Sequence, residues 1–281
     1  GGSQTISNDA IVNSSIVNNG GSQVVSSGAL ANDTVINSRG YQYISSGGTA
    51  KNAIINTNAS QFVMSDGIVS DTIVNSKGVQ QIYYGGQVYN TVQNSGGIIQ
   101  VDVKNGTYVD GINELGNAFQ LSSGIANNFI INSGGSQVIY SGKEANNTIV
   151  NSRGYQYISS GGIASNPILN LSGYQYISDG GLAENIIINS LGSQNILYNG
   201  SANNTSVLNG GYQNLLGGTA NSTIINSSGI QNVSTGNANF TIINSEGIQN
   251  MISGTANNTT VNAGGKQILS HGLANNTTID Y

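Results

Sequence analysis

The sequence contains no cysteine, little charge and no long apolar run. Without cysteine, the chain can form neither a disulfide framework nor a thiolate metal site. Charged residues make up 7% of the chain, compared with about 25% in a typical soluble domain. The net charge of −5 provides no basic patch, which argues against a nucleic acid as a partner. No apolar run approaches the ~20 residues that a membrane-spanning helix needs.

Asparagine, serine, threonine and glycine occupy the polar positions that lysine and glutamate fill in many other proteins. Glycine alone accounts for 40 of the 281 residues, about twice its usual share. A composition with many polar residues can indicate disorder. In this chain, however, the apolar residues recur at fixed intervals and include many isoleucines and valines. We therefore expect a folded, repetitive structure.

The whole sequence is an array of similar copies. The nonapeptide at residues 40–48 recurs unchanged at 154–162 and with one substitution at 173–181. The residues that open the copies are spaced by 19 and later by 18: Gly2, Gly21, Gly40, Ala59, Gly78, Gly97, Gly116, Gly135, Gly154, Gly173, Gly192, Gly211, Gly229, Gly247 and Gly265. A fixed period indicates a solenoid, so we predict one continuous array over residues 1–281. Because the chain begins within a copy and shows no signal peptide, we also expect it to be part of a longer protein.

Each copy has the pattern of one turn of a parallel β-helix. In residues 135–153, Gln137 and Ile139 alternate with Val138 and Tyr140, which is the periodicity of a strand. A turn is expected at residues 142–144, and a second apolar strand at 148–150. Two short strands and their turns, repeated along the chain, predict turns stacked about 4.8 Å apart. The predicted fold is therefore all-β: a single-stranded parallel β-helix, or solenoid, of about 15 rungs.

Two apolar columns and one glutamine column are predicted to face the interior. The first apolar column stands four residues after the opening glycine, as at Ile44, and the second includes Ile36 and Val150. Alternation places the glutamines on the same side as the first column. The glutamine column consists of Gln4, Gln23, Gln42, Gln61, Gln80, Gln137, Gln156, Gln175, Gln194, Gln213, Gln231, Gln249 and Gln267. The apolar residues Ile99 and Ala118 fill its two gaps, and stacked amides can bond one another inside the core.

A second polar ladder is predicted at the corner that follows the second strand. It consists of Asn18, Asn37, Asn56, Asn75, Asn94, Asn132, Asn151, Asn170, Asn189, Asn226, Asn244 and Asn262. Asparagine tolerates a left-handed backbone and can bond turn groups through its side chain. We expect both ladders to serve the structure rather than a function.

Aromatic residues gather on the outward side of the first strand. They are Tyr41, Tyr43, Phe62, Tyr83, Tyr140, Tyr155, Tyr157, Tyr174 and Tyr176. Stacks of this kind can simply stabilise a flat parallel sheet. They can also form a contact face, because aromatic rings on a rigid surface stack on sugars or pack against another copy. Both interpretations stay open.

One rung, at residues 97–116, departs from the pattern. It loses the glutamine and the second-strand motif, and it gathers Asp102, Asp110 and Glu114 beside Lys104. It predicts either a protruding or repacked coil, or a binding loop or weak cation site. Nothing in the sequence predicts a catalytic group, a cofactor or a strong metal site, because the one histidine, His271, has no recognisable catalytic partner.

The repeat resembles a known family of surface proteins. The unit that runs from Gly135-Ser136-Gln137 to Asn151 is similar to the passenger-domain repeats of diffuse-adherence (AIDA-type) self-associating autotransporter adhesins. The resemblance implies a right-handed β-helix exported through the outer membrane to the bacterial cell surface or secreted. It also implies adherence to a host-cell surface or glycan, autoaggregation with other copies, and biofilm formation.

The resemblance further implies a glycosyltransferase partner, because several such passengers carry heptose on serines of the repeat. The matching serines lie in the Ser-Ser-Gly turns and are Ser26, Ser27, Ser45, Ser46, Ser159 and Ser160. Two other functions stay open beside the adhesive passenger: a carbohydrate-active enzyme on the same scaffold, and a passive stalk whose adhesive tip lies outside this chain. The enzyme would need an acidic pair converging on one groove, which the sequence does not display.

Overall fold

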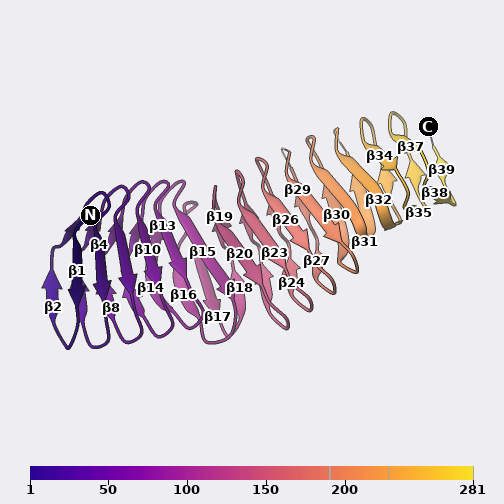
Figure 1. Cartoon of the computed structure of the whole chain (residues 1–281). Helices are drawn as coiled ribbons and strands as arrows, with labels where there is room; N and C mark the ends of the chain where they lie inside the picture. Colours follow the sequence, from indigo (N-terminus) through magenta and orange to yellow (C-terminus); the bar gives the residue numbers. More distant parts are fainter. Residues whose placement is uncertain (190, 227, 281) are drawn as a thin grey trace. The chain divides into compact units, whose positions relative to one another are not determined.

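The computed structural model describes residues 1–189, 191–226 and 228–280, and shows a β-solenoid of about 14 turns with no helix in the described residues. Parallel neighbours are 19 residues apart at Tyr41 and Ser60, and 18 apart at Tyr212 and Ile230. The chain divides into two compact units, Gly1–Gln137 and Val138–Tyr281, which we call unit 1 and unit 2. Figure 1 shows the stacked strands within each unit. That the two units form one continuous array stays a prediction.

A regular turn contains three strands, whereas the sequence predicted two. The first strands are β1 (Ser3–Ile6), β4 (Ser22–Val25), β7 (Tyr41–Ile44), β10 (Ser60–Val63), β13 (Val79–Ile82), β15 (Ile98–Val103), β20 (Ser136–Ile139), β23 (Tyr155–Ile158), β26 (Tyr174–Ile177), β29 (Ser193–Leu197), β34 (Ile248–Met251) and β37 (Lys266–Leu269). The middle strands are β2 (Ile11–Asn13), β5 (Leu30–Asn32), β8 (Thr49–Lys51), β11 (Ile68–Ser70), β16 (Tyr108–Ile112), β18 (Ile125–Asn127), β21 (Glu144–Asn146), β24 (Ile163–Ser165), β27 (Leu182–Glu184), β35 (Thr255–Asn257) and β38 (Leu273–Asn275).

The third strands are only two residues long: β3 (Ile16–Val17), β6 (Val35–Ile36), β9 (Ile54–Ile55), β12 (Ile73–Val74), β19 (Ile130–Ile131), β22 (Ile149–Val150), β25 (Ile168–Leu169), β28 (Ile187–Ile188), β33 (Ile242–Ile243), β36 (Thr260–Val261) and β39 (Thr278–Ile279). Some turns join neighbouring strands without a break, in β14 (Gln87–Gln93), β30 (Ser201–Val207), β31 (Tyr212–Ile225) and β32 (Ile230–Asn239). The remaining strand, β17 (Ala118–Ser122), directly follows the rung that the sequence marks as irregular.

The middle strand escaped prediction because a single small residue marks it. In β21, Ala145 is 1% exposed between two polar neighbours that point outward. Three residues with one buried alanine are too short to show a recognisable alternation. The segment at Gly142 that was assigned to a turn therefore leads directly into a strand.

The predicted interior columns are confirmed in the regular turns. Ile44, Ile158, Ile36 and Val150 are all 0% exposed. Most of the glutamine column is equally buried, and its amides bond from turn to turn: Gln42 Nε2 donates to Gln23 Oε1 at 2.7 Å. Each amide oxygen thus accepts a hydrogen bond that burial would otherwise leave unmade.

Buried threonines donate to several glutamines of the column, an arrangement that was not predicted from the sequence. Thr34 Oγ1 donates to Gln23 Oε1 at 3.1 Å, so that this oxygen accepts both a hydroxyl and the amide of the next turn. The same pair recurs as Thr223 and Gln213 at 3.1 Å. A threonine ten or eleven residues after most of the glutamines is the signal that would have found it, although Ser15, Ala53, Pro167 and Ile186 take that place in four copies.

The asparagine ladder is present, but not for the reason first given. Asn56 Nδ2 donates to Asn37 Oδ1 at 2.9 Å, in the expected column. The left-handed residues lie elsewhere in the turn, at positions such as Asn52 and Asn147, each with φ of 54°. The ladder asparagine instead closes the turn through its backbone, because Asn37 O accepts from Gly40 N at 2.7 Å.

The first part of the irregular rung is a regular turn, because β15 pairs in parallel with β13 and β16 pairs in parallel with β14. The chain then reverses into an antiparallel hairpin that continues to Ser122. Strand β16 pairs antiparallel with β17, which pairs antiparallel with β18. Gly116, expected to open a rung, lies in the hairpin turn with φ of 80°, and no parallel first strand follows it. One of the fifteen sequence copies therefore contributes no turn of its own.

The hairpin also reverses one predicted orientation. Ala118 was expected in the core, but it is exposed, and Phe119 is buried instead at 2% exposure. The antiparallel pairing shifts the inward positions by one residue, as happens whenever strand register changes by one. Asn113 holds the turn, because its Oδ1 accepts from Leu115 N at 3.0 Å and Asn117 N at 3.1 Å.

Candidate contact surface

Four tyrosines of unit 2 form a stacked group, which we call the tyrosine cluster: Tyr155, Tyr157, Tyr174 and Tyr176. The parallel register of β23 and β26 sets Tyr155 beside Tyr174 and Tyr157 beside Tyr176. The ring centroids of these two pairs are 5.3 and 5.4 Å apart, with interplanar angles of 13° and 14°. The rings point outward because Gln156 on the same strand is fully buried. The cluster is therefore a rigid aromatic surface.

Tyr176 of this cluster keeps its proton more tightly than a free tyrosine. Desolvation raises the pKa of Tyr176, and the neighbouring phenols raise it further, with Tyr157 the largest of these contributions. Tyr157 is 38% exposed and the other three rings are half-buried. An incoming ligand therefore meets ring surface and phenol hydroxyls rather than ionised groups.

Unit 1 carries a smaller aromatic group on β7 and β10. Tyr43 and Phe62 stack at 4.9 Å with an interplanar angle of 12°, and Tyr41 lies 6.4 Å from both rings. The register pairs Phe62 with Tyr43 on the neighbouring strand. This group has the same outward orientation on its strands as the tyrosine cluster has on β23 and β26.

Two of the predicted aromatic residues lie outside these groups. Tyr83 and Tyr140 follow the last residues of β13 and β20, so they stand in the turns rather than on the outward side of the strands. In a further pair, Tyr89 and Tyr108, the ring centroids are 5.0 Å apart and the rings are tilted by 30°. This pair could not be recognised from the sequence, because the two residues lie 19 apart in segments that lack the repeat pattern.

The turn serines are divided by their exposure. Ser27, Ser46 and Ser160 are exposed, whereas the serines that precede them are half-buried: Ser26, Ser45 and Ser159. Ser27 and Ser160 sit against glycines of the next turn. A Cβ placed on Gly47 would lie 2.7 Å from Ser27 Oγ, and one on Gly180 would lie 2.9 Å from Ser160 Oγ. A glycine of the next turn therefore leaves space beside Ser27 and Ser160, whereas Asp66 stands at the equivalent place beside Ser46.

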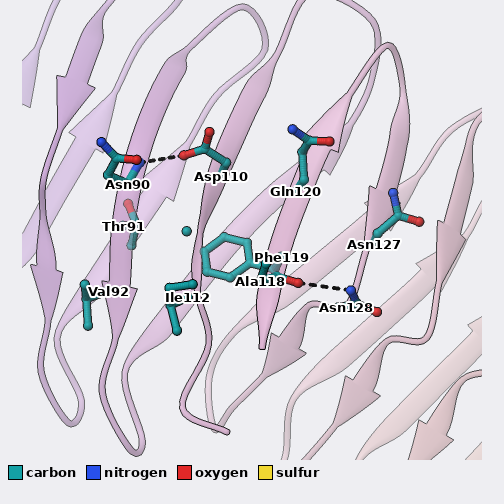
Figure 2. A pocket seen from close by; sticks show the side chains of 11 residues that line it. Asn90, Thr91, Val92, Asp110, Ile112, Ala118, Phe119, Gln120, Asn127 and Asn128 are labelled. Atoms are coloured by element: carbon teal, nitrogen blue, oxygen red, sulfur yellow. Dashed lines mark hydrogen bonds between the residues drawn. The ribbon is translucent and has the colours of Figure 1, made fainter. Parts of the chain in front are cut away.

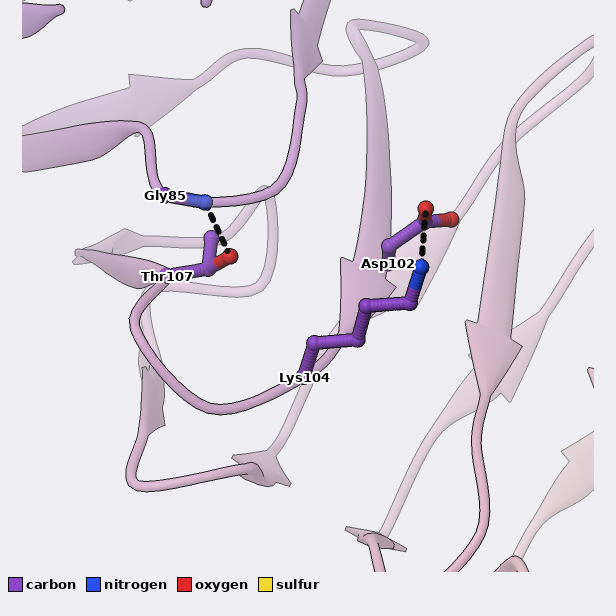
Figure 3. Close-up of polar contacts among 4 residues, drawn as sticks. All are labelled: Gly85, Asp102, Lys104 and Thr107. Atoms are coloured by element: carbon purple, nitrogen blue, oxygen red, sulfur yellow. Dashed lines mark hydrogen bonds and ion pairs between the residues drawn. The ribbon is translucent and has the colours of Figure 1, made fainter. Parts of the chain in front are cut away.

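The acidic residues of the irregular rung do not converge. Asp102 forms an ion pair with Lys104 at 3.7 Å, as Figure 3 shows, beside a bond in which Gly85 N donates to Thr107 Oγ1 at 3.0 Å. Glu114 Oε2 accepts from Gly96 N at 2.7 Å, which places it at a different turn. Within residues 1–189, 191–226 and 228–280, no three acidic, histidine or cysteine side chains gather as a metal site would require. No helix suited to crossing a membrane occurs in the described part of the chain.

Comparison with known proteins agrees with the repeat pattern. Residues 36–97 and 110–166 match the family described as "Adhesin of bacterial autotransporter system, probable stalk". The crystal structure of a TibA fragment hyper-glycosylated by TibC is similar to this chain, with 32% identity, 99% of this chain and 94% of that chain covered, and a TM-score of 0.50. No curated protein is significantly similar in sequence.

Two other solved structures are similar at a much lower level. The surface protein and adhesin PfbA of Streptococcus pneumoniae shares 9% identity over 100% of this chain and 90% of that chain, with a TM-score of 0.25. The A-module of the mannuronan C-5 epimerase AlgE4 of Azotobacter vinelandii shares 9% identity over 99% and 86%, with a TM-score of 0.22. Neither similarity is high enough to bear on function.

The family assignment therefore rests on the TibA fragment and on the matched repeats. Membership of a family of autotransporter adhesins implies display at the outer membrane or cell surface of a bacterium. The family model describes a stalk, which agrees with a repetitive solenoid. The chain belongs to the AIDA-type autotransporter adhesins, and its residues 36–97 and 110–166 match the repeats of their probable stalk.

Proposed function

We propose that this chain is an adhesive segment of its passenger, and that the tyrosine cluster is its contact face. Its partner is a glycan of a host-cell surface or a second copy of the chain, and the outcome is adherence, autoaggregation or biofilm formation. The observation that carries the proposal is the stacking of four outward tyrosines on adjacent strands, with paired centroids 5.3 and 5.4 Å apart.

Rigidity and low charge make such a surface suitable for contact. Tyrosine offers a large area with few rotatable bonds, so little conformational entropy is lost on binding. Here the rings are already stacked before any partner arrives. Because the whole chain has a net charge of only −5, two copies repel each other weakly. Sugars and a second aromatic stack are both suited to such a face.

The test is a fourfold variant displayed on cells: Tyr155→Ser, Tyr157→Ser, Tyr174→Ser and Tyr176→Ser. We expect a clear loss of cell binding or aggregation with little change in fold, because these side chains lie outside the core. The matched control replaces by serine the four asparagines that continue the column of Tyr157 and Tyr176 on the following turns: Asn195, Asn214, Asn232 and Asn250. If the folded tyrosine variant adheres and aggregates like the wild type, the chain is a passive stalk and the adhesive face lies elsewhere.

We further propose that a glycosyltransferase modifies the exposed turn serines. The TibA fragment, which is 32% identical to this chain, is glycosylated by TibC. Exposure favours Ser27, Ser46 and Ser160 over the half-buried serines that precede them. Co-expression with TibC followed by peptide mass spectrometry tests whether the exposed serines are modified in preference to the half-buried ones. Modification confined to Ser26, Ser45 and Ser159 would contradict it.

An enzymatic role finds no support among the described residues. Hydrolysis of a glycosidic bond usually needs two carboxylates across one site, about 5–10 Å apart. The acids of the irregular rung instead bond separately to Lys104, to Gly96 and to the strand next to them. Adhesion therefore remains the function that the geometry supports best.

A further inference from the structure

The hairpin of the irregular rung creates a groove in unit 1 with a volume of about 550 Å³. This volume falls within the range of about 300–1,000 Å³ that small-molecule sites occupy. The groove crosses four strands: β14, β16, β17 and β18. Figure 2 shows it from close by.

Two rows of side chains run across these strands, one polar and one apolar. The pairing sets Asp110 beside Gln120, and Gln120 beside Asn127, while Asn90 stands across from Asp110 on β14. Two residues further along the strands, the same pairing sets Val92, Ile112 and Ala118 side by side. Two residues of a strand span about 6.6 Å, which is comparable to the width of a sugar ring.

The floor between the rows is the backbone at Gly111, because Asp110 and Ile112 on either side point into the groove and position 111 faces the packed interior. A Cβ on Gly111 would lie 2.0 Å from Thr91 O and 2.8 Å from Phe119 Cζ. The buried ring of Phe119 supports the floor from below, at 2% exposure. The groove is therefore a built feature of the hairpin and not a gap between mobile side chains.

The polar row holds its carboxylate in a fixed position. Asp110 Oδ1 accepts from the backbone Asn90 N at 2.5 Å, and Oδ2 accepts from Tyr108 Oη at 2.7 Å. Gln120 Nε2 donates to the same tyrosine oxygen at 3.2 Å. Each carboxylate oxygen keeps a further lone pair, so it can accept from a ligand hydroxyl. Amides beside it can donate and accept in the same plane.

The apolar row complements a ligand that has both hydroxyls and C–H groups. Val92 and Ile112 are 41% and 44% exposed, so they offer aliphatic surface directly to the groove. Such a combination of a few fixed polar groups with apolar walls is typical of small-ligand sites. A sugar matches it, since a pyranose has equatorial hydroxyls at its edge and C–H groups on its face.

We propose that this groove binds a neutral saccharide, lying across the strands between the two rows. Neutrality follows from the lining, because the described residues around the groove include the carboxylate of Asp110 and neither lysine nor arginine. A sialylated, uronic or phosphorylated sugar would bring a second negative charge against Asp110 without a counter-ion. The groove and the tyrosine cluster share no residues, so this proposal can be tested independently of the proposed adhesive face.

The experiment measures binding of the whole chain to neutral and acidic glycans on one array, with lactose and sialyllactose as a matched pair. Saturation-transfer-difference NMR of the neutral hits then maps the bound face. We expect at least one neutral oligosaccharide to bind, and sialyllactose to bind more weakly than lactose. No binding to any neutral glycan, or stronger binding of the acidic member of the pair, overturns the proposal.

Two variants locate the site. Ala118→Phe fills the apolar row and should weaken binding by at least about tenfold. Its control, Ile125→Phe, adds a ring to an outward residue of β18 that is 42% exposed and does not line the groove. Equal loss in both variants, or unchanged binding in Ala118→Phe, contradicts the assignment. Asp110→Asn keeps an acceptor for Asn90 N but removes the negative charge. It should therefore reduce the difference in affinity between lactose and sialyllactose.

Discussion

The regular turns of unit 2 and the hairpin region of unit 1 build different surfaces from similar residue types. In β23 and β26 every residue stands beside its own counterpart one turn away, so like stacks on like. Around β16 and β17 the direction of the chain reverses, and unlike residues such as Asp110 and Gln120 become neighbours. Repetition thus yields ladders that stabilise, whereas the break in repetition yields a concave surface with mixed chemistry.

The largest expected effect concerns a ladder. Gln175 is fully buried, donates to Gln156 at 2.6 Å and accepts from Gln194 at 2.7 Å. Gln175→Glu removes the donor and buries a charge, so we expect a loss of about 3–5 kcal/mol. Gln175→Leu introduces no charge and only leaves the amides of Gln156 and Gln194 without this partner, so it should cost about 1–3 kcal/mol. Urea denaturation of both variants at pH 7 gives the comparison.

The pH dependence of the stability of Gln175→Glu follows from the direction in which the pKa of the new carboxyl shifts. Burial raises the pKa of the introduced carboxyl in the folded state above its value of about 4.3 in the unfolded chain. The folded state therefore binds the proton more tightly, so the penalty vanishes at low pH and grows as pH rises through the folded pKa. A penalty that does not shrink between pH 7 and pH 4 would mean that the carboxylate finds water or a cation in the ladder.

The next effect concerns the hairpin. Gly111→Ala places a methyl group 2.0 Å from Thr91 O, and that backbone can move only by disturbing the pairing of β14 and β16. We expect a loss of about 2–4 kcal/mol. The control is Gly116→Ala, which meets no atom within 4 Å but has φ of 80°, and should cost about 1 kcal/mol. Hydrogen exchange should rise near residues 108–122 in the first variant, and an equal effect of both changes would show that the floor is not tightly packed.

These differences also explain what the sequence could and could not predict. The interior columns and the glutamine ladder were predictable because fifteen copies repeat each position, so the pattern does not depend on any single residue. Ala118 was assigned to the wrong side because it was placed by analogy with the other copies. The hairpin depends on bonds that occur once, such as those of Asn113 Oδ1 to Leu115 N and Asn117 N. No repetition reveals such bonds, and for the same reason the groove was invisible in the sequence.

A smaller effect is expected from the tyrosine cluster, as a loss of stability at alkaline pH. Because the pKa of Tyr176 is raised in the folded state, the unfolded chain ionises first, at about pH 10. The stabilising contribution is complete below that pH and is lost as pH rises through the folded pKa. Thermal unfolding between pH 9 and pH 11 should therefore show a drop in midpoint that is smaller in the fourfold serine variant. An equal drop in both proteins would assign the alkaline sensitivity to other tyrosines.

The smallest effect on stability is expected from the ion pair of Asp102 and Lys104. Asp102 and Lys104 are 3.7 Å apart, with side chains that are 35% and 32% exposed, and Lys104 Nζ also lies 5.9 Å from the centre of the Tyr84 ring. Ion pairs that reach solvent contribute about 0–1 kcal/mol, because water screens the attraction and both side chains lose freedom. Lys104→Ala should therefore change the denaturation midpoint far less than Gln175→Glu, although both changes remove polar partners. The physical reason is burial: an amide ladder without access to water cannot replace a lost bond, whereas an exposed carboxylate can bond to water instead. A loss above about 2 kcal/mol in Lys104→Ala would show that this ion pair, and not the hairpin turn at Asn113, holds the irregular rung in place.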